Sequence, residues 1–478
     1  MNTKPILNLF GLLITAFSFI FLPPFVIGVL FNEGFSFKFL YYFIAISLLG
    51  LFVWITNRNS GLELKVVDGF IITALFWVVL TLLGAIPFLG FGMHPIDAFF
   101  ESSSGITTTG ASVLSNLESL PKSMLLYRQL LQWVGGMGLI ILVVAIMPTL
   151  GIGGGQLFKM ESPGSSSSEK LTPRIKESAK ALWVIYLSLT VLCFISYYLA
   201  GMTLFDAISH ALSTVSIGGF STHDESIGFF NSFGIEAVCI FFMLLSAISF
   251  ALHYDVFYRK KYLKYFYDHE LRFFMSSIFI VVLLCLICIL VYPSFGADKI
   301  RPIIFQSVSI LTTSGFKTDS FHAWPGYIPF LLLIGAFIGA CSMSVGGGIK
   351  SWRVLIVLNQ AKKVIMKTIH PNAVVITKMG NKVVPDEVSN KVWGFLAIYV
   401  ITFLFLLILV LLTGLDFETA FSAVGATINN LGPGLGGVSE NYALLPSSTK
   451  LILSFSMILG RLEILTLLVL ITPAFWRR

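Results

Sequence analysis

About ten runs of roughly twenty apolar residues follow one another along this chain, and they limit its fold more than any other feature. Inside lipid only helices and closed barrels satisfy their own backbone polar groups, and runs of this length suit helices. Only 12% of the 478 residues are charged, whereas a soluble protein would carry about 25%. We therefore predict an all-α polytopic membrane protein. The runs lie near 6–31, 36–56, 66–90, 123–149, 179–201, 228–257, 272–293, 325–360 (interrupted), 391–413 and 449–475.

Basic residues are concentrated in alternate loops between these runs. They occur at Arg58/Lys65, Lys159–Lys180, Arg259–Lys264, Lys362–Lys382 and Arg477/Arg478. Cytoplasmic loops of membrane proteins carry an excess of Lys and Arg, so this distribution predicts that all five segments and both termini are cytoplasmic. The net charge of +7 then reflects topology rather than nucleic-acid binding.

Four short glycine-bearing segments recur at intervals of about a hundred residues: TTTGAS, STVSIGGFS, TTSGF and TINNLGPG. Each follows an amphipathic segment of about 10–13 residues, which is too short to cross a bilayer and is tolerable at depth only inside protein or beside a water-filled cavity. The pattern predicts two N-terminal helices and then four units of helix, pore helix and helix around one axis. The expected boundaries are 1–60 for the helix pair, and 61–158, 159–262 (with a cytoplasmic linker at 159–178), 263–385 and 386–478 for the four pore repeats.

The four loops are candidates for a cation filter. A dehydrating cation needs oxygen atoms in place of its water, and backbone carbonyls supply them where the chain can turn them toward an axis. Glycine permits the backbone angles and the close approach that this requires. The fourth loop is expected to carry three extra residues, because Asp416 precedes Gly432 by sixteen residues whereas Asp97 precedes Gly110 by thirteen. The candidate K⁺-binding residues are Thr108, Thr109, Gly110, Ile217, Gly218, Gly219, Thr313, Ser314, Gly315, Asn430, Leu431 and Gly432.

The chain resembles the bacterial TrkH-type potassium uptake proteins of the Trk/Ktr/HKT superfamily along nearly its whole length. The resemblance rests on ESSSGITTTGAS, QWVGGMG, ESPGSSSSEKLTPRIKESAKALW, STVSIGGFSTHDESIGFF, ILTTSGFKTDSF, GGGIK and INNLGPGLG. It implies potassium uptake at the bacterial inner membrane by a homodimer, each protomer with its own pore. It also implies a cytoplasmic, RCK-type nucleotide-binding regulatory subunit (TrkA-like), so that no cofactor is expected on this chain. Gly110 stands where sodium-selective relatives carry serine, which favours potassium.

Two features predict a gate within the membrane. Gly346, Gly347 and Gly348 interrupt a long apolar run and are followed by Lys350, and successive glycines disfavour helix by about 1 kcal/mol each relative to alanine. The segment 339–350 matches the intramembrane gating loop of the family. Arg461 lies near the middle of the last apolar run, where a charge is costly and usually functional. It is predicted either to act beside the pore on the gating loop or to bind carbonyls of a neighbouring helix.

Other functions stay open on the residues alone. A proton- or sodium-coupled symporter needs intramembrane carboxylates, and the apolar runs offer few, namely Asp68, Glu236 and Glu463. A membrane-embedded enzyme needs clustered His, Asp or Cys, and the sequence has no such cluster; no metal site other than the K⁺ filter is predicted. The hydrophilic stretch Lys159–Lys180 is interpreted as a solvated connection or as a docking surface for a cytoplasmic partner.

Overall fold

The computed structural model describes residues 3–58, 66–146, 175–292, 295–380 and 382–476. The predicted linker at 159–178 lies outside the described residues except for its last four. Helices make up most of the described chain, which confirms the predicted all-α membrane class. Six described helices are long and apolar enough to cross a membrane: Lys4–Leu30, Ser36–Thr56, Asp68–Gly90, Lys180–Leu199, His269–Val291 and Asp386–Leu411.

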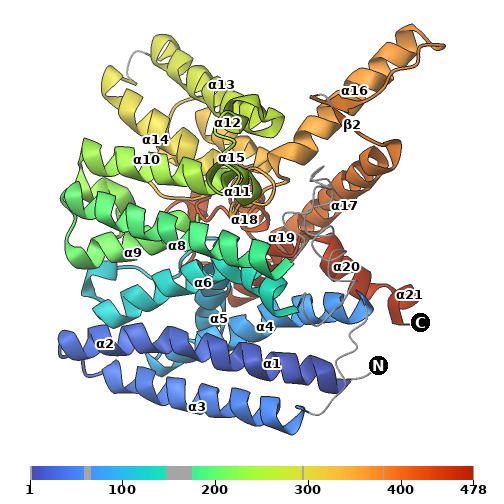
Figure 1. The fold of residues 1–478 in the computed structure, drawn as a ribbon. Helices are drawn as coiled ribbons and strands as arrows, with labels where there is room; N and C mark the ends of the chain where they lie inside the picture. The colour runs from blue at the N-terminus through green and yellow to red at the C-terminus, as the bar shows by residue number, and fades with distance from the viewer. Residues whose placement is uncertain (1–2, 59–65, 147–174, 293–294, 381, 477–478) are drawn as a thin grey trace.

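The N-terminal helices lie side by side at one end of the molecule (Figure 1). The first span consists of α1 (Thr3–Ser18), η1 (Phe19–Phe21) and α2 (Leu22–Leu30), and it packs along α3 (Ser36–Thr56). Gly11 and Gly50 allow this close packing, since a Cβ on Gly11 would lie 2.4 Å from the Trp54 nitrogen. Their apolar side chains form one core with α4 (Val66–Gly90) and α6 (Lys122–Ile146).

Four short helices of twelve residues each end four residues before one of the recurring glycines. They are α5 (Pro95–Ile106), α9 (Leu204–Val215), α14 (Ile300–Leu311) and α18 (Phe417–Ile428). A long helix precedes each of them: α4, α8 (Ile175–Leu199), α13 (His269–Val291) and α17 (Asp386–Leu411).

The expectation of three extra residues in the fourth loop is wrong. Asp416 is the residue before α18, where its side chain accepts a hydrogen bond from the Thr419 nitrogen. Asp97 and Asp206 are instead the third residues of their helices. Acidic residues are favourable both at the cap and in the first turn of a helix. The three-residue difference therefore lies at the start of the helix, where the acidic residue stands at different positions. From the end of each helix to its glycine, the four loops have equal length.

Three of the four helices that follow the glycine loops are broken. Among the described residues only α6 is continuous, and its predicted span to 149 extends past them. The predicted span 228–257 is a pair, α10 (Phe233–Ala247) and α11 (Phe250–Phe257), bent by 93°. The 325–360 run consists of α15 (Ile328–Ile338), a loop and α16 (Ser351–Ile369). The last run is divided into α19 (Ser447–Arg461), α20 (Leu465–Ile471) and α21 (Pro473–Trp476).

Short elements complete the described chain, and α16 projects from the body together with a small hairpin (Figure 1). The hairpin pairs β1 (Lys378–Met379) with β2 (Lys382–Val383) in antiparallel register. The remaining short helices are η2 (Leu117–Ser119), η4 (Ser226–Phe230), α12 (Lys264–Tyr267), η5 (Ala297–Lys299), η6 (Phe321–Ala323) and η7 (Gly436–Val438).

Candidate ion pathway

The four glycine loops share one backbone conformation although their sequences differ. In each loop, the glycine and the residue two positions before it adopt positive φ. Side-chain-bearing residues rarely do so, and for β-branched ones the cost is high, so a fourfold recurrence marks an imposed geometry. The pairs are Thr108 (56°) with Gly110 (84°), Ile217 (53°) with Gly219 (79°), Thr313 (64°) with Gly315 (78°), and Asn430 (52°) with Gly432 (91°).

These loops meet in a closed ring. A Cβ placed on each glycine would collide with the carbonyl oxygen of the residue before the glycine in the neighbouring loop. The contacts run in chain order and return to the start, so all twelve predicted filter residues belong to loops of one ring. Measured from the Cβ placed on each glycine, the distances are 2.3 Å for Gly110 to the Gly218 oxygen, 2.1 Å for Gly219 to the Ser314 oxygen, 2.1 Å for Gly315 to the Leu431 oxygen, and 2.6 Å for Gly432 to the Thr109 oxygen.

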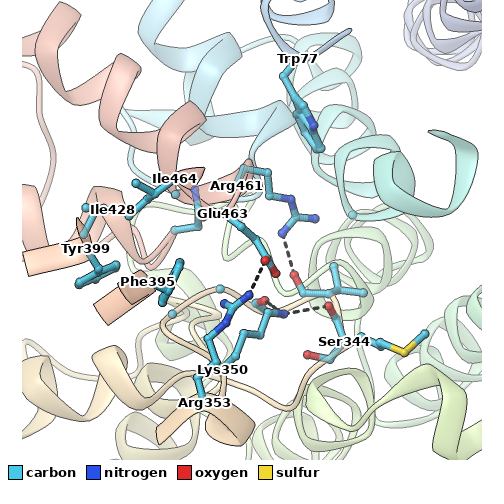
Figure 2. A pocket seen from close by; sticks show the side chains of 18 of the residues that line it. Trp77, Ser344, Lys350, Arg353, Phe395, Tyr399, Ile428, Arg461, Glu463 and Ile464 are labelled. Carbon is cyan, nitrogen blue, oxygen red and sulfur yellow. Dashed lines mark hydrogen bonds and ion pairs between the residues drawn. The ribbon is translucent and has the colours of Figure 1, made fainter. Parts of the chain in front are cut away.

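A hollow opens on each side of the ring. The outer hollow, about 580 Å³ with open solvent included, is lined by all four glycines and by charged residues such as Lys317 and Glu440. The inner hollow, about 1150 Å³ on the same measure, is lined by Asn430, by residues 343–348, and by Arg461. Figure 2 shows the charged side chains of α16 and of the α19–α20 junction pointing toward one another in this inner hollow.

The predicted triglycine segment lies directly against two loops of the ring. The Gly347 nitrogen donates a 2.7 Å hydrogen bond to the Thr313 hydroxyl. A Cβ on Gly347 would lie 2.0 Å from the Asn429 oxygen, so a side chain does not fit there. Lys350 folds back over the segment and donates to the Gly346 oxygen at 2.7 Å (Figure 2). The segment therefore lies between these two loops and the inner hollow, which it lines together with Asn430.

Arg461 connects this segment to a second helix. Its guanidinium donates to the Val345 oxygen at 2.8 Å, immediately before the triglycine (Figure 2), and to the Gly135 oxygen of α6 at 3.1 Å. The guanidinium also lies over the Trp77 ring, 5.6 Å from its centre. The two predicted positions of Arg461, beside the gating loop or bound to carbonyls of a neighbouring helix, are therefore both occupied. One carbonyl that it binds belongs to the segment 339–350, and the other belongs to α6.

The comparisons with known proteins agree along the whole chain. A family model described as "TrkH: Cation transport protein" matches residues 35–478. The chain belongs to the TrkH family. The Trk system potassium uptake proteins TrkH of Halomonas elongata and Vibrio parahaemolyticus are 47% and 46% identical to it, each over 100% of both chains. The crystal structure of the potassium transporter TrkH from Vibrio parahaemolyticus covers 100% of both chains with a TM-score of 0.91 and 44% identity.

Membership in the TrkH family confirms the resemblance found in the sequence. It also confirms a membrane transporter of cations rather than an enzyme, because the matching family and relatives are transport proteins. Two of the three carboxylates considered for ion coupling are held in ion pairs: Glu236 with Arg301, and Glu463 with Arg353. Neither pair was anticipated from the sequence.

The ring of this TrkH-family protein is braced by a glutamine that sequence reasoning missed. The Gln132 amide nitrogen donates to the Gly218 oxygen at 2.6 Å. The Gln132 oxygen accepts from the Ser213 hydroxyl at 2.6 Å and from the Phe220 nitrogen at 3.1 Å. One buried side chain therefore holds both ends of the second loop. The only signal was a polar residue inside an apolar run, within the family motif QWVGGMG.

A fully buried ion pair braces the first two loops. The Arg128 guanidinium donates to the Glu101 carboxylate at 2.8 Å, with side chains 1% and 0% exposed. Arg128 also donates to the Ser221 oxygen at 3.2 Å, and Glu101 accepts from the Val113 nitrogen at 3.0 Å. Removing one partner of such a pair leaves an uncompensated buried charge, so both residues are needed to hold the backbone that follows Gly110 and Gly219.

The segment 339–350 is also fastened to the broken helix α10–α11. The Cys341 nitrogen donates to the Ala247 oxygen at 3.0 Å, and the Phe250 nitrogen donates to the Met343 oxygen at 3.0 Å. These bonds satisfy backbone groups that the break between α10 and α11 frees, which is what makes such a break tolerable inside a membrane. The segment is therefore held by the α10–α11 pair in addition to Thr313 and Arg461.

Proposed function

We propose that this chain carries K⁺ into the cell through the ring of four glycine loops. The observation that supports this most is the closed ring, in which four carbonyl oxygens (of Thr109, Gly218, Ser314 and Leu431) stand at equivalent places. Such oxygens replace the hydration shell of a cation. The four short helices end just before the ring, and the negative ends of their dipoles favour a cation there. Relatives over the whole length are named potassium uptake proteins.

The proposed orientation places the outer hollow toward the cell exterior and the inner hollow toward the cytoplasm. Its support is the concentration of basic residues in alternate loops, which the positive-inside rule assigns to the cytoplasm together with both termini. The four helix–short helix–helix units then form the four pore repeats, with the boundaries given above, around one conduction axis. The membrane is the bacterial plasma membrane.

The segment 339–350 is the proposed gate, with Gly346, Gly347, Gly348 and Lys350 below the ring and Arg461 as its latch. In the described conformation the segment packs against Thr313 and Asn429, between the ring and the inner hollow. Conduction then requires the segment to move aside, which successive glycines make less costly.

The working unit is proposed to be a homodimer with a cytoplasmic RCK-type nucleotide-binding subunit. The support is the family resemblance alone. Nucleotide then acts on the partner, and this chain supplies the conduction path and the gate.

The experiment that tests the proposed function is ion flux into liposomes that contain the purified protein. With a K⁺ gradient and no added substrate, we expect K⁺ flux that exceeds Na⁺ flux by about tenfold rather than several-hundredfold, because each loop supplies a filter of only one glycine. Protein-free liposomes serve as the control. Absence of K⁺ flux from both the wild-type protein and the Arg461→Ala variant, in which the latch is removed, contradicts the proposal. Flux that requires an imposed pH gradient favours proton symport instead.

A further inference from the structure

The third loop carries a lysine where the other three loops carry small residues. Two positions after the glycines stand Ser112, Ser221, Lys317 and Gly434. Lys317 lines the outer hollow together with the four ring glycines. An ammonium group is a fixed monovalent cation, so Lys317 places a positive charge in the space from which a cation would reach the ring.

The backbone of Lys317 is held in place by the segment that follows the second loop. The Lys317 nitrogen donates to the Ser226 hydroxyl at 3.3 Å, and the Lys317 oxygen accepts from the Gly228 nitrogen at 3.1 Å. Phe316 before it is fully buried, and its oxygen accepts from the Ser309 hydroxyl at 2.6 Å. The Lys317 side chain is 19% exposed. The backbone from which the Lys317 side chain extends is therefore fixed beside the hollow.

Glu440 balances this charge from the fourth loop. The Lys317 ammonium donates to the Glu440 carboxylate at 2.8 Å, and the Ser320 hydroxyl donates to its other oxygen at 3.0 Å. The hydrogen bond from Lys317 lowers the pKa of Glu440, although burial opposes it. Because that pKa falls below its ordinary value, Glu440 is ionised at neutral pH.

The segment that carries Glu440 is itself fastened to the ring. Two residues on, the Tyr442 nitrogen donates to the Ser112 oxygen at 2.8 Å, and the Tyr442 hydroxyl donates to the Gly432 oxygen at 2.7 Å. The ion pair therefore bridges the third and fourth loops at the mouth of the ring.

The other residues with ionisable side chains that line the outer hollow are Arg128, His223 and Asp224. Arg128 is neutralised by Glu101 in the buried pair described above. Asp224 lies beside Glu118, whose carboxylate accepts from the Asp224 nitrogen, and His223 lies 3.4 Å from Glu118. Within the described lining, Lys317 and Glu440 thus form the ion pair in which a single substitution leaves one unit charge unbalanced. The main-chain hydrogen bonds of Lys317 and the hydrogen bonds of Tyr442 still hold the two loops after such a substitution.

We propose that the Lys317–Glu440 pair sets how readily K⁺ reaches the ring from the outer hollow, a role that rests on the proposed function of the ring. The pair acts electrostatically, because the ammonium repels an incoming cation and the carboxylate attracts it. Charges in a cleft with low-dielectric walls act strongly on the local concentration of a charged solute. Paired, the two effects nearly cancel; alone, each changes the apparent affinity for K⁺ in the opposite direction.

The test is the apparent KM for K⁺ of two single variants, measured by uptake into liposomes at low ionic strength. Lys317→Gln is expected to lower the KM, and Glu440→Gln to raise it, each by about three- to tenfold, because each leaves one unit charge near the path. The double variant returns toward the wild-type KM. Salt at about 1 M shrinks the Debye length to about 3 Å and is expected to remove most of both shifts.

A matched control is the exposed ion pair of Lys391 and Glu387 at the start of α17. Neutralising either of these residues should leave the KM unchanged. A merely structural Lys317–Glu440 bridge would shift the KM of both single variants in the same direction. If wild-type K⁺ flux is normal, that result overturns the inference, and so does the absence of a shift in either variant. Absence of K⁺ flux from both the wild-type protein and the Arg461→Ala variant overturns the proposed function instead.

Discussion

Liposomes that contain the Arg461→Ala variant should leak K⁺ about ten- to a hundredfold faster than liposomes with the wild-type protein. The substitution removes the hydrogen bonds to the Val345 and Gly135 oxygens. Hydrogen bonds from a charged group are worth about 1.5–3 kcal/mol each, and part of this is regained in any open state. A loss of about 1.4–2.7 kcal/mol from the closed state corresponds to that range of rates. The measurement is passive K⁺ flux per reconstituted protein, without a regulatory partner.

Arg461→Lys is the matched control for this prediction. Lysine keeps the charge and has a single ammonium group, which does not reach both carbonyls with the fork geometry of a guanidinium, so its leak should be intermediate. Unchanged or reduced flux in Arg461→Ala, with normal expression and normal thermal stability, would contradict a latch and leave Arg461 as a structural charge.

Gly315→Ala should abolish measurable K⁺ flux, a loss of at least about a hundredfold. The added Cβ would lie 2.1 Å from the Leu431 oxygen, and the φ of +78° is unfavourable for alanine by about 1–2 kcal/mol. The third loop must then move away from the fourth, which opens the ring. Flux is measured in liposomes as above, together with the ratio of K⁺ to Na⁺ flux, which should fall toward one in any residual activity.

Gly394→Ala provides the comparison for a glycine without this constraint. Gly394 lies within α17, and nothing lies within 4 Å of the place of its Cβ. Alanine favours helix over glycine there by about 1 kcal/mol, so flux should persist and stability should not fall. If Gly315→Ala folds normally and conducts K⁺ as well as Gly394→Ala does, the ring is not the conduction path.

The sequence was most informative where glycine recurs at positions that need its small size and its backbone freedom. The four glycines and the short helices before them are predicted from spacing and from the length that a membrane span needs, and the triglycine segment is predicted from the helix-breaking effect of successive glycines inside an apolar run. The closure of the ring was not predictable in the same way. It depends on contacts such as Gly432 with the Thr109 oxygen, between residues more than three hundred positions apart.

The features that sequence reasoning missed are pairs and breaks fixed by tertiary structure. Glu101 with Arg128, and Arg353 with Glu463, are partners from elements far apart in the sequence, and no local pattern assigns them to each other. The break at Ile248 contains neither glycine nor proline, and hydrogen bonds from the segment 339–350 compensate it. The misplaced offset before Gly432 arose because an acidic residue suits both the cap and the first turn of a helix.

The central claim is that the carbonyl ring binds the transported ion. Its most direct test is a crystal structure of the protein with K⁺ replaced by Tl⁺, whose anomalous scattering locates the ion without ambiguity. The account predicts an anomalous peak on the axis of the ring, surrounded by the oxygens of Thr109, Gly218, Ser314 and Leu431. If protein that conducts K⁺ shows no Tl⁺ peak in the ring, or shows its peak at another site within the membrane, the result would contradict this account.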